Sequence, residues 1–159
     1  MAVKIYSVRT EILPALRFIG KRCICGPEDF VAKWDEWIDK GWFVQLEKLG
    51  VAPENGDAYW GVTTDDGCCY WIGLLFPPGT PAPDDYEYAD SPAANYAVFA
   101  IEGKKEGELL SEDGINLVFE EMRKRGMTSL KGGWGLERYS RPASGGKDKV
   151  LLEFLNAIK

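Results

Sequence analysis

The order of the expected secondary-structure elements is the feature that most constrains the fold of this chain. Hydrophobic periodicity and the positions of glycine and proline predict a strand, a helix and two more strands within residues 15–76. The same order is predicted within residues 95–158, offset by about eighty residues at each element. Two such units would place two helices against one side of a continuous antiparallel sheet, which is an α+β fold.

Residues that interrupt regular secondary structure mark the ends of the individual elements. Pro14 divides residues 3–25 into two strands joined by a kink, and Asp65-Asp66-Gly67 is the turn of a hairpin. A helix is predicted over 28–49 and another over 111–125, the second with Ser111 as its N-cap and Gly126 after its end. The other expected segments are strands at 57–64, 68–76, 95–102, 134–139 and 149–158, a short edge segment within 84–90 and a turn at 144–146.

A chain of 159 residues is large enough for one domain with a real core, so residues 1–159 are expected to form a single domain. Within it, the two units define pseudo-repeats at about 3–77 and 95–158. Their sequence identity is negligible, so the order of secondary-structure elements repeats and the amino-acid sequence does not. A groove is expected where the units meet, and such grooves are ordinary ligand sites.

Charge and residue usage exclude several classes of function. The formal net charge of −6 argues against a nucleic-acid-binding surface, which needs a basic stripe. There is no histidine, which removes Ser–His and Cys–His catalysis and histidine metal ligation. The spacing of Cys23, Cys25, Cys68 and Cys69 matches neither zinc knuckles nor a redox pair, so we expect no metal, no cofactor and no disulfide. Small buried hydrophobic side chains are the expected role of these cysteines.

The N-terminal sequence and the hydropathy give an expectation about location. Lys4, Arg9 and Glu11 interrupt the first apolar stretch, so it does not resemble a secretory signal. No apolar run is long enough to cross a membrane. A cytoplasmic protein with no membrane partner is therefore the expectation.

Glu137 is the most informative single residue. It lies in the segment 132–139, which is rich in glycine and aromatic residues, and strand alternation places it on one face with Tyr139. If this face is buried, an unpaired carboxylate among aromatic rings would bind a cation or perform acid–base chemistry. If the face is exposed, Glu137 pairs with Arg138 or a nearby lysine, and both alternatives stay open on the pattern alone.

Taken together, four stretches resemble the GyrI-like small-molecule-binding domain, the effector-binding domain of AraC-type and MerR-type multidrug regulators. The resemblance extends from about Lys4 to Ile158. The matching stretches are Leu13-Pro14-Ala15-Leu16-Arg17, Trp60-Gly61-Val62, Asn95-Tyr96-Ala97-Val98-Phe99 with Gly103, and Glu137-Arg138-Tyr139. The chain departs from many members at Asn156-Ala157-Ile158, where it lacks a proline.

The resemblance implies a duplicated strand-helix-strand-strand fold and a groove that binds hydrophobic, often cationic, aromatic compounds. In the family, a glutamate reaches the floor of this groove, and Glu137 matches its position. Tyr139, Trp71, Tyr96 and Trp134 are the aromatic residues expected around it, with core packing as the alternative for Trp71. Trp134 has the opposite strand parity to Glu137 and would need a bulge to join it.

Three functions are compatible with the resemblance. The first is a stand-alone protein for multidrug binding, sensing or sequestration, without the helix-turn-helix domain that regulators carry. The second is a cofactor-independent hydrolase that detoxifies cyclopropanoid cyclohexadienone genotoxins, with Glu137 activating water and Tyr139 or Tyr96 assisting. The third is a gyrase-inhibitor-like interaction protein, although the sequence shows no dense acidic block.

Overall fold

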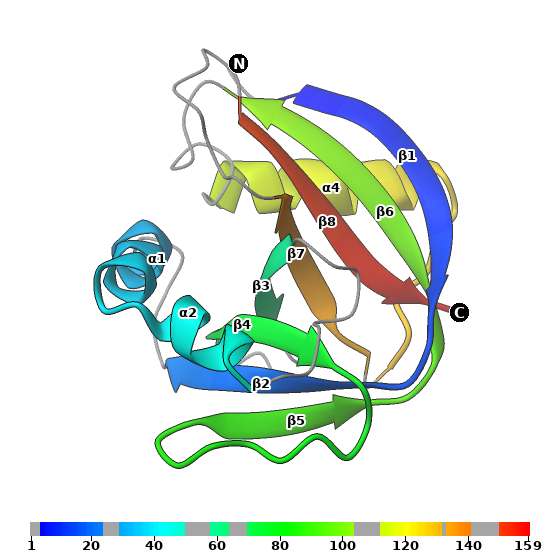
Figure 1. The fold of residues 1–159 in the computed structure, drawn as a ribbon. Coiled ribbons are helices and arrows are strands. Elements are labelled where there is room, and N and C mark those ends of the chain that lie inside the picture. The colour runs from blue at the N-terminus through cyan, green and yellow to red at the C-terminus, as the bar shows by residue number, and fades with distance from the viewer. Residues whose placement is uncertain are drawn as a thin grey trace.

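The computed structural model of the protein describes residues 4–23, 29–49, 58–63, 70–103, 112–131, 133–140 and 150–159. These residues form an α+β fold with one antiparallel sheet of eight strands in the order β1-β6-β8-β7-β3-β4-β2-β5 (Figure 1). The strands are β1 (Lys4–Leu13), β2 (Leu16–Cys23), β3 (Ala58–Thr63), β4 (Tyr70–Phe76), β5 (Glu87–Ser91), β6 (Ala94–Gly103), β7 (Gly135–Ser140) and β8 (Val150–Ile158). The helices are α1 (Phe30–Asp39), α2 (Trp42–Glu47) and α4 (Glu112–Lys124).

The strand order has the same form when it is read from either end. One half contains β2, β4 and β3 in spatial order, and the other half contains β6, β8 and β7 in the corresponding positions. The halves meet where β7 pairs with β3, with Glu137 opposite Gly61. The predicted α+β fold with an antiparallel sheet is confirmed, whereas the division into pseudo-repeats at 3–77 and 95–158 stays a prediction.

Most element positions agree with the sequence pattern, and one helix does not. The kink at Pro14 is confirmed, because β1 ends at Leu13 and β2 begins at Leu16. The prediction of a single helix over 28–49 is wrong: α1 ends at Asp39 and α2 begins at Trp42. Gly41 separates them with a φ of 69°, a left-handed conformation that glycine adopts without steric cost and that a continuous helix cannot contain.

The second predicted helix ends as expected. Gly126 has a φ of 71°, and the Met127 backbone N–H donates to the Met122 carbonyl at 3.0 Å, which closes the last turn of α4. The predicted N-cap Ser111 and the turn at 144–146 lie outside the described residues. So do Cys25, Cys68 and Cys69, while Cys23 is half-buried and carries no disulfide.

Side chains alternate between two buried faces of the sheet. The helix-side core, which packs against α1, α2 and α4, consists of Ile19, Trp34, Trp37, Phe43, Leu46, Tyr70, Ile72, Leu74, Phe76, Ala97, Phe99, Ile101, Val118, Met122, Leu152 and Ile158. The second-face core consists of Leu13, Leu16, Phe18, Trp60, Val62, Trp71, Leu75, Tyr96, Val98, Trp134, Leu136, Leu155 and Ala157. Both faces are therefore apolar, which explains the continuous hydrophobic run of β4.

The sheet curls toward the second face. Glu11 of β1 accepts a hydrogen bond from Arg138 of β7 at 3.0 Å, although β6 and β8 lie between these strands. Phe18 of β2 and Trp134, which precedes β7, have ring centroids 6.5 Å apart across β4 and β3. Three strand spacings in a flat sheet would be about 14 Å. In Figure 1 the β1-β6-β8 half and the β4-β2-β5 half accordingly run in different directions.

Within the described ranges, none of the helices combines the length and the apolar character that a membrane crossing requires.

Candidate functional site

Glu137 lies at the centre of the sheet and is buried. Its strand, β7, is flanked by β8 and β3, and the residues opposite it are Phe154 and Gly61. Strand alternation places all three on the helix side of the sheet. The Glu137 residue is only 4% exposed. Of the two orientations that the sequence allowed, the structure has the inward one.

A chain of hydrogen bonds connects helix α1 to this carboxylate. The Trp34 indole N–H donates to the Tyr70 hydroxyl at 2.8 Å, and the Tyr70 hydroxyl donates to Oε1 of Glu137. The three side chains come from α1, β4 and β7, and each is buried. Donation by the indole polarises the tyrosine hydroxyl, which makes it a stronger donor toward the carboxylate.

Gly61 makes this arrangement sterically possible. Strand β3 lies between β4 and β7, so the Tyr70 side chain must cross β3 to reach Glu137. A Cβ at position 61 would lie 2.6 Å from Oε1 of Glu137 and would also overlap the Tyr70 hydroxyl. The absence of a side chain on Gly61 therefore opens the space in which the tyrosine meets the carboxylate.

Burial strongly perturbs the acidity of Glu137. Loss of hydration raises the pKa of its carboxyl from 4.5 to about 7, and the hydrogen bond from Tyr70 opposes this rise. Among the described residues, no cationic side chain pairs with Glu137. Arg138, the next residue, faces the other side of the sheet, where it donates to Glu153 at 2.8 Å and to Glu11 at 3.0 Å.

This environment gives the carboxyl group two chemical capacities. In its ionised form it is a buried negative charge that can pair with a cation of suitable shape. With a pKa near neutrality, it can also accept or release a proton at physiological pH. The described residues contain no group of three or more acidic or cysteine side chains that could hold a metal ion.

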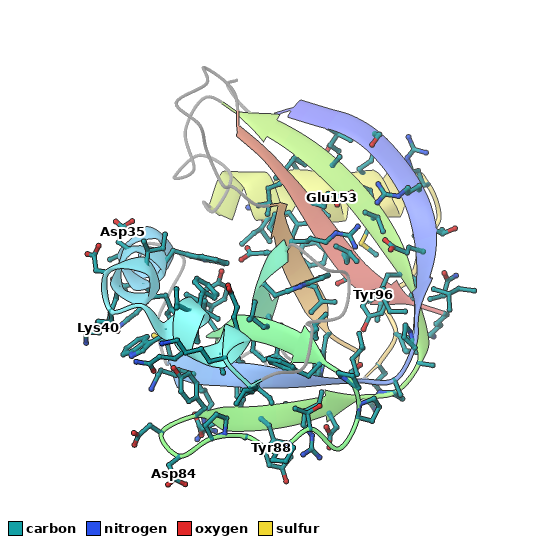
Figure 2. The ribbon with its side chains drawn as sticks, in the orientation of Figure 1. Asp35, Lys40, Asp84, Tyr88, Tyr96 and Glu153 are labelled. Carbon is teal, nitrogen blue, oxygen red and sulfur yellow. The ribbon has the colours of Figure 1, made fainter. Side chains whose placement is uncertain are left out.

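Of the other residues expected at the site, three lie away from Glu137. Tyr139 shares its face by strand register, and its side chain lies outside the described part of the structure. Trp71, Tyr96 and Trp134 all belong to the second-face core, so the sheet separates their rings from the Glu137 carboxylate. Figure 2 shows Tyr96 on the half of the molecule that also carries Glu153.

Sequence reasoning did not place Tyr70 or Trp34 at the site. The contact between Tyr70 and Glu137 depends on the pairing of β3 with both β4 and β7. Local periodicity does not reveal this pairing. One signal was present: Gly61 interrupts an otherwise bulky strand, and a glycine inside a strand often marks close approach of another group.

A surface hollow at the C-terminal end of α4 is separate from this site. It measures about 400 Å³ and is lined by Phe119, Met122, Arg123, Gly126, Met127, Thr128 and Ser129. Its lining contains no carboxylate and none of the residues that surround Glu137.

No protein-family model matches the chain, and no curated protein matches it significantly in sequence. Solved structures do match. SAV2435 bound to tetraphenylphosphonium is similar with a TM-score of 0.71 and 14% identity, over 96% of this chain and 94% of that chain. A putative bacterial transcription regulation protein from Staphylococcus aureus MU50 has a TM-score of 0.67 and 15% identity, over 96% and 98% of the two chains.

The C-terminal domain of EcmrR is also similar, with a TM-score of 0.68 and 10% identity, over 97% of this chain and 98% of that chain. At these identities the likeness establishes a shared fold. The chain therefore has the fold of the GyrI-like small-molecule-binding domain, and the fold predicted from the sequence resemblance is confirmed.

Proposed function

We propose that this protein binds hydrophobic aromatic cations, with Glu137 as the countercharge. The observation that supports this most strongly is a carboxylate that is 4% exposed and has no cationic partner among the described residues. A buried ionised group without a partner is costly, so folds retain one mainly where it serves binding or chemistry. An external cation would supply the missing partner.

The chemistry of the site favours an organic cation over a metal ion. A single carboxylate provides too few oxygen ligands for calcium or magnesium. A delocalised aromatic cation is weakly hydrated, so it loses little on entering an apolar site. A structure of the same fold, SAV2435, holds tetraphenylphosphonium, which is an ion of this type. We propose multidrug binding for sensing or sequestration as the biological use.

Replacing Glu137 with glutamine is expected to weaken tetraphenylphosphonium binding about ten- to a hundredfold, because a partly desolvated charge pair is lost. Binding of the neutral triphenylphosphine oxide should change by less than about threefold, since glutamine preserves the shape of the side chain. Isothermal titration at a pH above 8, where Glu137 is ionised, would measure both ligands.

Glu120→Gln is the matched control, because it removes the same charge from an exposed position on α4. This variant should bind both ligands as the unmodified protein does. An equal loss of affinity for the cation and the neutral compound in Glu137→Gln would show that Glu137 shapes the site without supplying charge.

A second candidate is a cofactor-independent hydrolase of cyclopropane-fused cyclohexadienones. It is favoured by the pKa of Glu137 at about 7, which suits a general base at neutral pH. Water would attack the cyclopropane carbon, Glu137 would take the water's proton, and the broken C–C bond would deliver its electrons to the dienone oxygen. Tyr139 remains the proposed proton donor to that oxygen, whereas Tyr96 lies on the other face of the sheet.

A chromatographic assay of substrate loss would test this candidate. The protein should accelerate the loss over a no-protein control, and Glu137→Gln should remove the acceleration. Binding of the dienone without any acceleration would exclude the hydrolase and leave the binding function in place.

A further inference from the structure

The surroundings of Glu137 contain one titratable group among the described side chains. From β3 the carboxyl faces Gly61, from β8 it faces Phe154, and from β4 it meets the Tyr70 hydroxyl. Helix α1 contributes Trp34, which reaches the carboxyl only through Tyr70. Among the described side chains of these elements no positive charge faces Glu137, and the hydrogen bond from Tyr70 is the described contact that stabilises its ionised form.

Within strand β7 itself, the charged neighbour of Glu137 is Arg138, which pairs with other residues. Arg138 points to the second face, where Glu153 and Glu11 neutralise it, and Arg9 completes that group at 2.7 Å from Glu153. A proton is therefore the simplest neutralising partner for Glu137 in the ligand-free protein. The raised pKa of the carboxyl agrees with this, since burial is its main cause.

We propose that Glu137 exchanges a proton for an organic cation, so that binding of a permanently charged ligand expels one proton from the site. The carboxyl O–H bond breaks, the proton passes to the solvent buffer, and the resulting carboxylate pairs with the cation. The site is neutral before and after the exchange. This inference rests on the proposed function and adds its regulation: acidification would release the ligand.

The exchange assigns a positioning role to Tyr70. Its hydroxyl donates to the ionised carboxylate, and Trp34 fixes the hydroxyl by donating to its oxygen. Removing the Tyr70 hydroxyl would raise the pKa of Glu137 further, so the exchange would occur at higher pH. If Tyr70 had a purely structural role, its removal would change the ligand affinity by the same factor at every pH. The midpoint of the dependence of affinity on pH would then stay the same.

The exchange predicts a specific pH profile for tetraphenylphosphonium binding. Affinity should fall about tenfold per pH unit below pH 7 until it reaches the residual affinity of Glu137→Gln, and should level off above pH 7, because only the ionised carboxyl pairs with the cation. At pH 6, titration calorimetry in buffers of different ionisation enthalpy should report close to one proton released per ligand bound. Triphenylphosphine oxide should release none.

Three variants sharpen the test. Glu137→Gln should abolish proton release and flatten the pH profile of whatever binding remains. Tyr70→Phe should raise the midpoint of the profile, and Glu120→Gln should leave it unchanged. A midpoint that stays fixed or falls in Tyr70→Phe would overturn the role assigned to the tyrosine.

The unmodified protein alone can refute the exchange. Tetraphenylphosphonium binding with the same heat in every buffer and the same affinity from about pH 5 to 9 would contradict it and leave the proposed function intact. Absence of tetraphenylphosphonium binding at every pH would instead refute the proposed function, so the two failures are distinguishable.

Discussion

Replacing Glu137 with glutamine is expected to raise the free energy of unfolding by about 3 kcal/mol above pH 8 and to leave it nearly unchanged below pH 4.5. The reason is the difference between the ordinary pKa of 4.5 and the folded-state pKa of about 7. Each unit of pKa difference is worth about 1.4 kcal/mol. Glutamine has no proton to lose and keeps an oxygen that can accept the hydrogen bond from Tyr70.

The direction of the effect follows from where the proton is held. At acidic pH the carboxyl is protonated in both the folded and the unfolded chain, so burial carries no charge penalty. As the pH rises from 4.5 to about 7, the unfolded chain releases its proton while the folded protein retains it. The stability contributed by the neutral carboxyl is therefore lost across this interval, and the penalty is constant at higher pH.

Denaturant unfolding of both proteins at several pH values would measure this difference. Glu120→Gln, which changes the same charge at an exposed site, should show no comparable dependence on pH. Equal stability of Glu137→Gln and the unmodified protein at pH 9 would mean that the carboxyl is not desolvated as the structure shows. A residue that lowers the stability of the folded protein at its working pH is typically retained because function requires it.

The fold could be predicted because local signals and long-range pairing agree. Pro14 ends one strand, Gly126 ends α4, and alternation marks the strands, and each of these signals acts within a few residues. The break at Gly41 was missed because one glycine inside an apolar helical pattern is usually tolerated. Only the left-handed φ of Gly41 shows that the chain turns there.

The site could be predicted only in part. Glu137 and the face it shares with Tyr139 follow from the alternation within one strand. The partner Tyr70 depends on the spatial order of β4, β3 and β7, which no local pattern contains. The same limitation affected Trp71 and Tyr96, because central strands buried on both faces do not reveal which side a ring occupies.

Substituting alanine for Gly61 is expected to lower the free energy of unfolding by about 3 kcal/mol and to weaken tetraphenylphosphonium binding about tenfold. The new Cβ would lie 2.6 Å from Oε1 of Glu137 and 3.1 Å from Cζ of Tyr70. One of these side chains must move, which breaks the hydrogen bond between them and leaves a buried carboxyl without its described donor. Denaturant unfolding and calorimetric titration at the same pH would measure both effects.

Gly135→Ala provides the matched control, because Gly135 lies on the same strand and the same face as Glu137. A Cβ there would meet nothing closer than Asn156 Oδ1 at 3.8 Å, so stability should change by less than about 1 kcal/mol. A double-mutant cycle separates the cause from general overpacking. In a Tyr70→Phe background the hydroxyl that the new methyl would meet is gone, so Gly61→Ala should cost measurably less than it does alone. An unchanged cost would show that the methyl collides mainly with other atoms, and that Gly61 is not the residue that admits the tyrosine to the carboxylate.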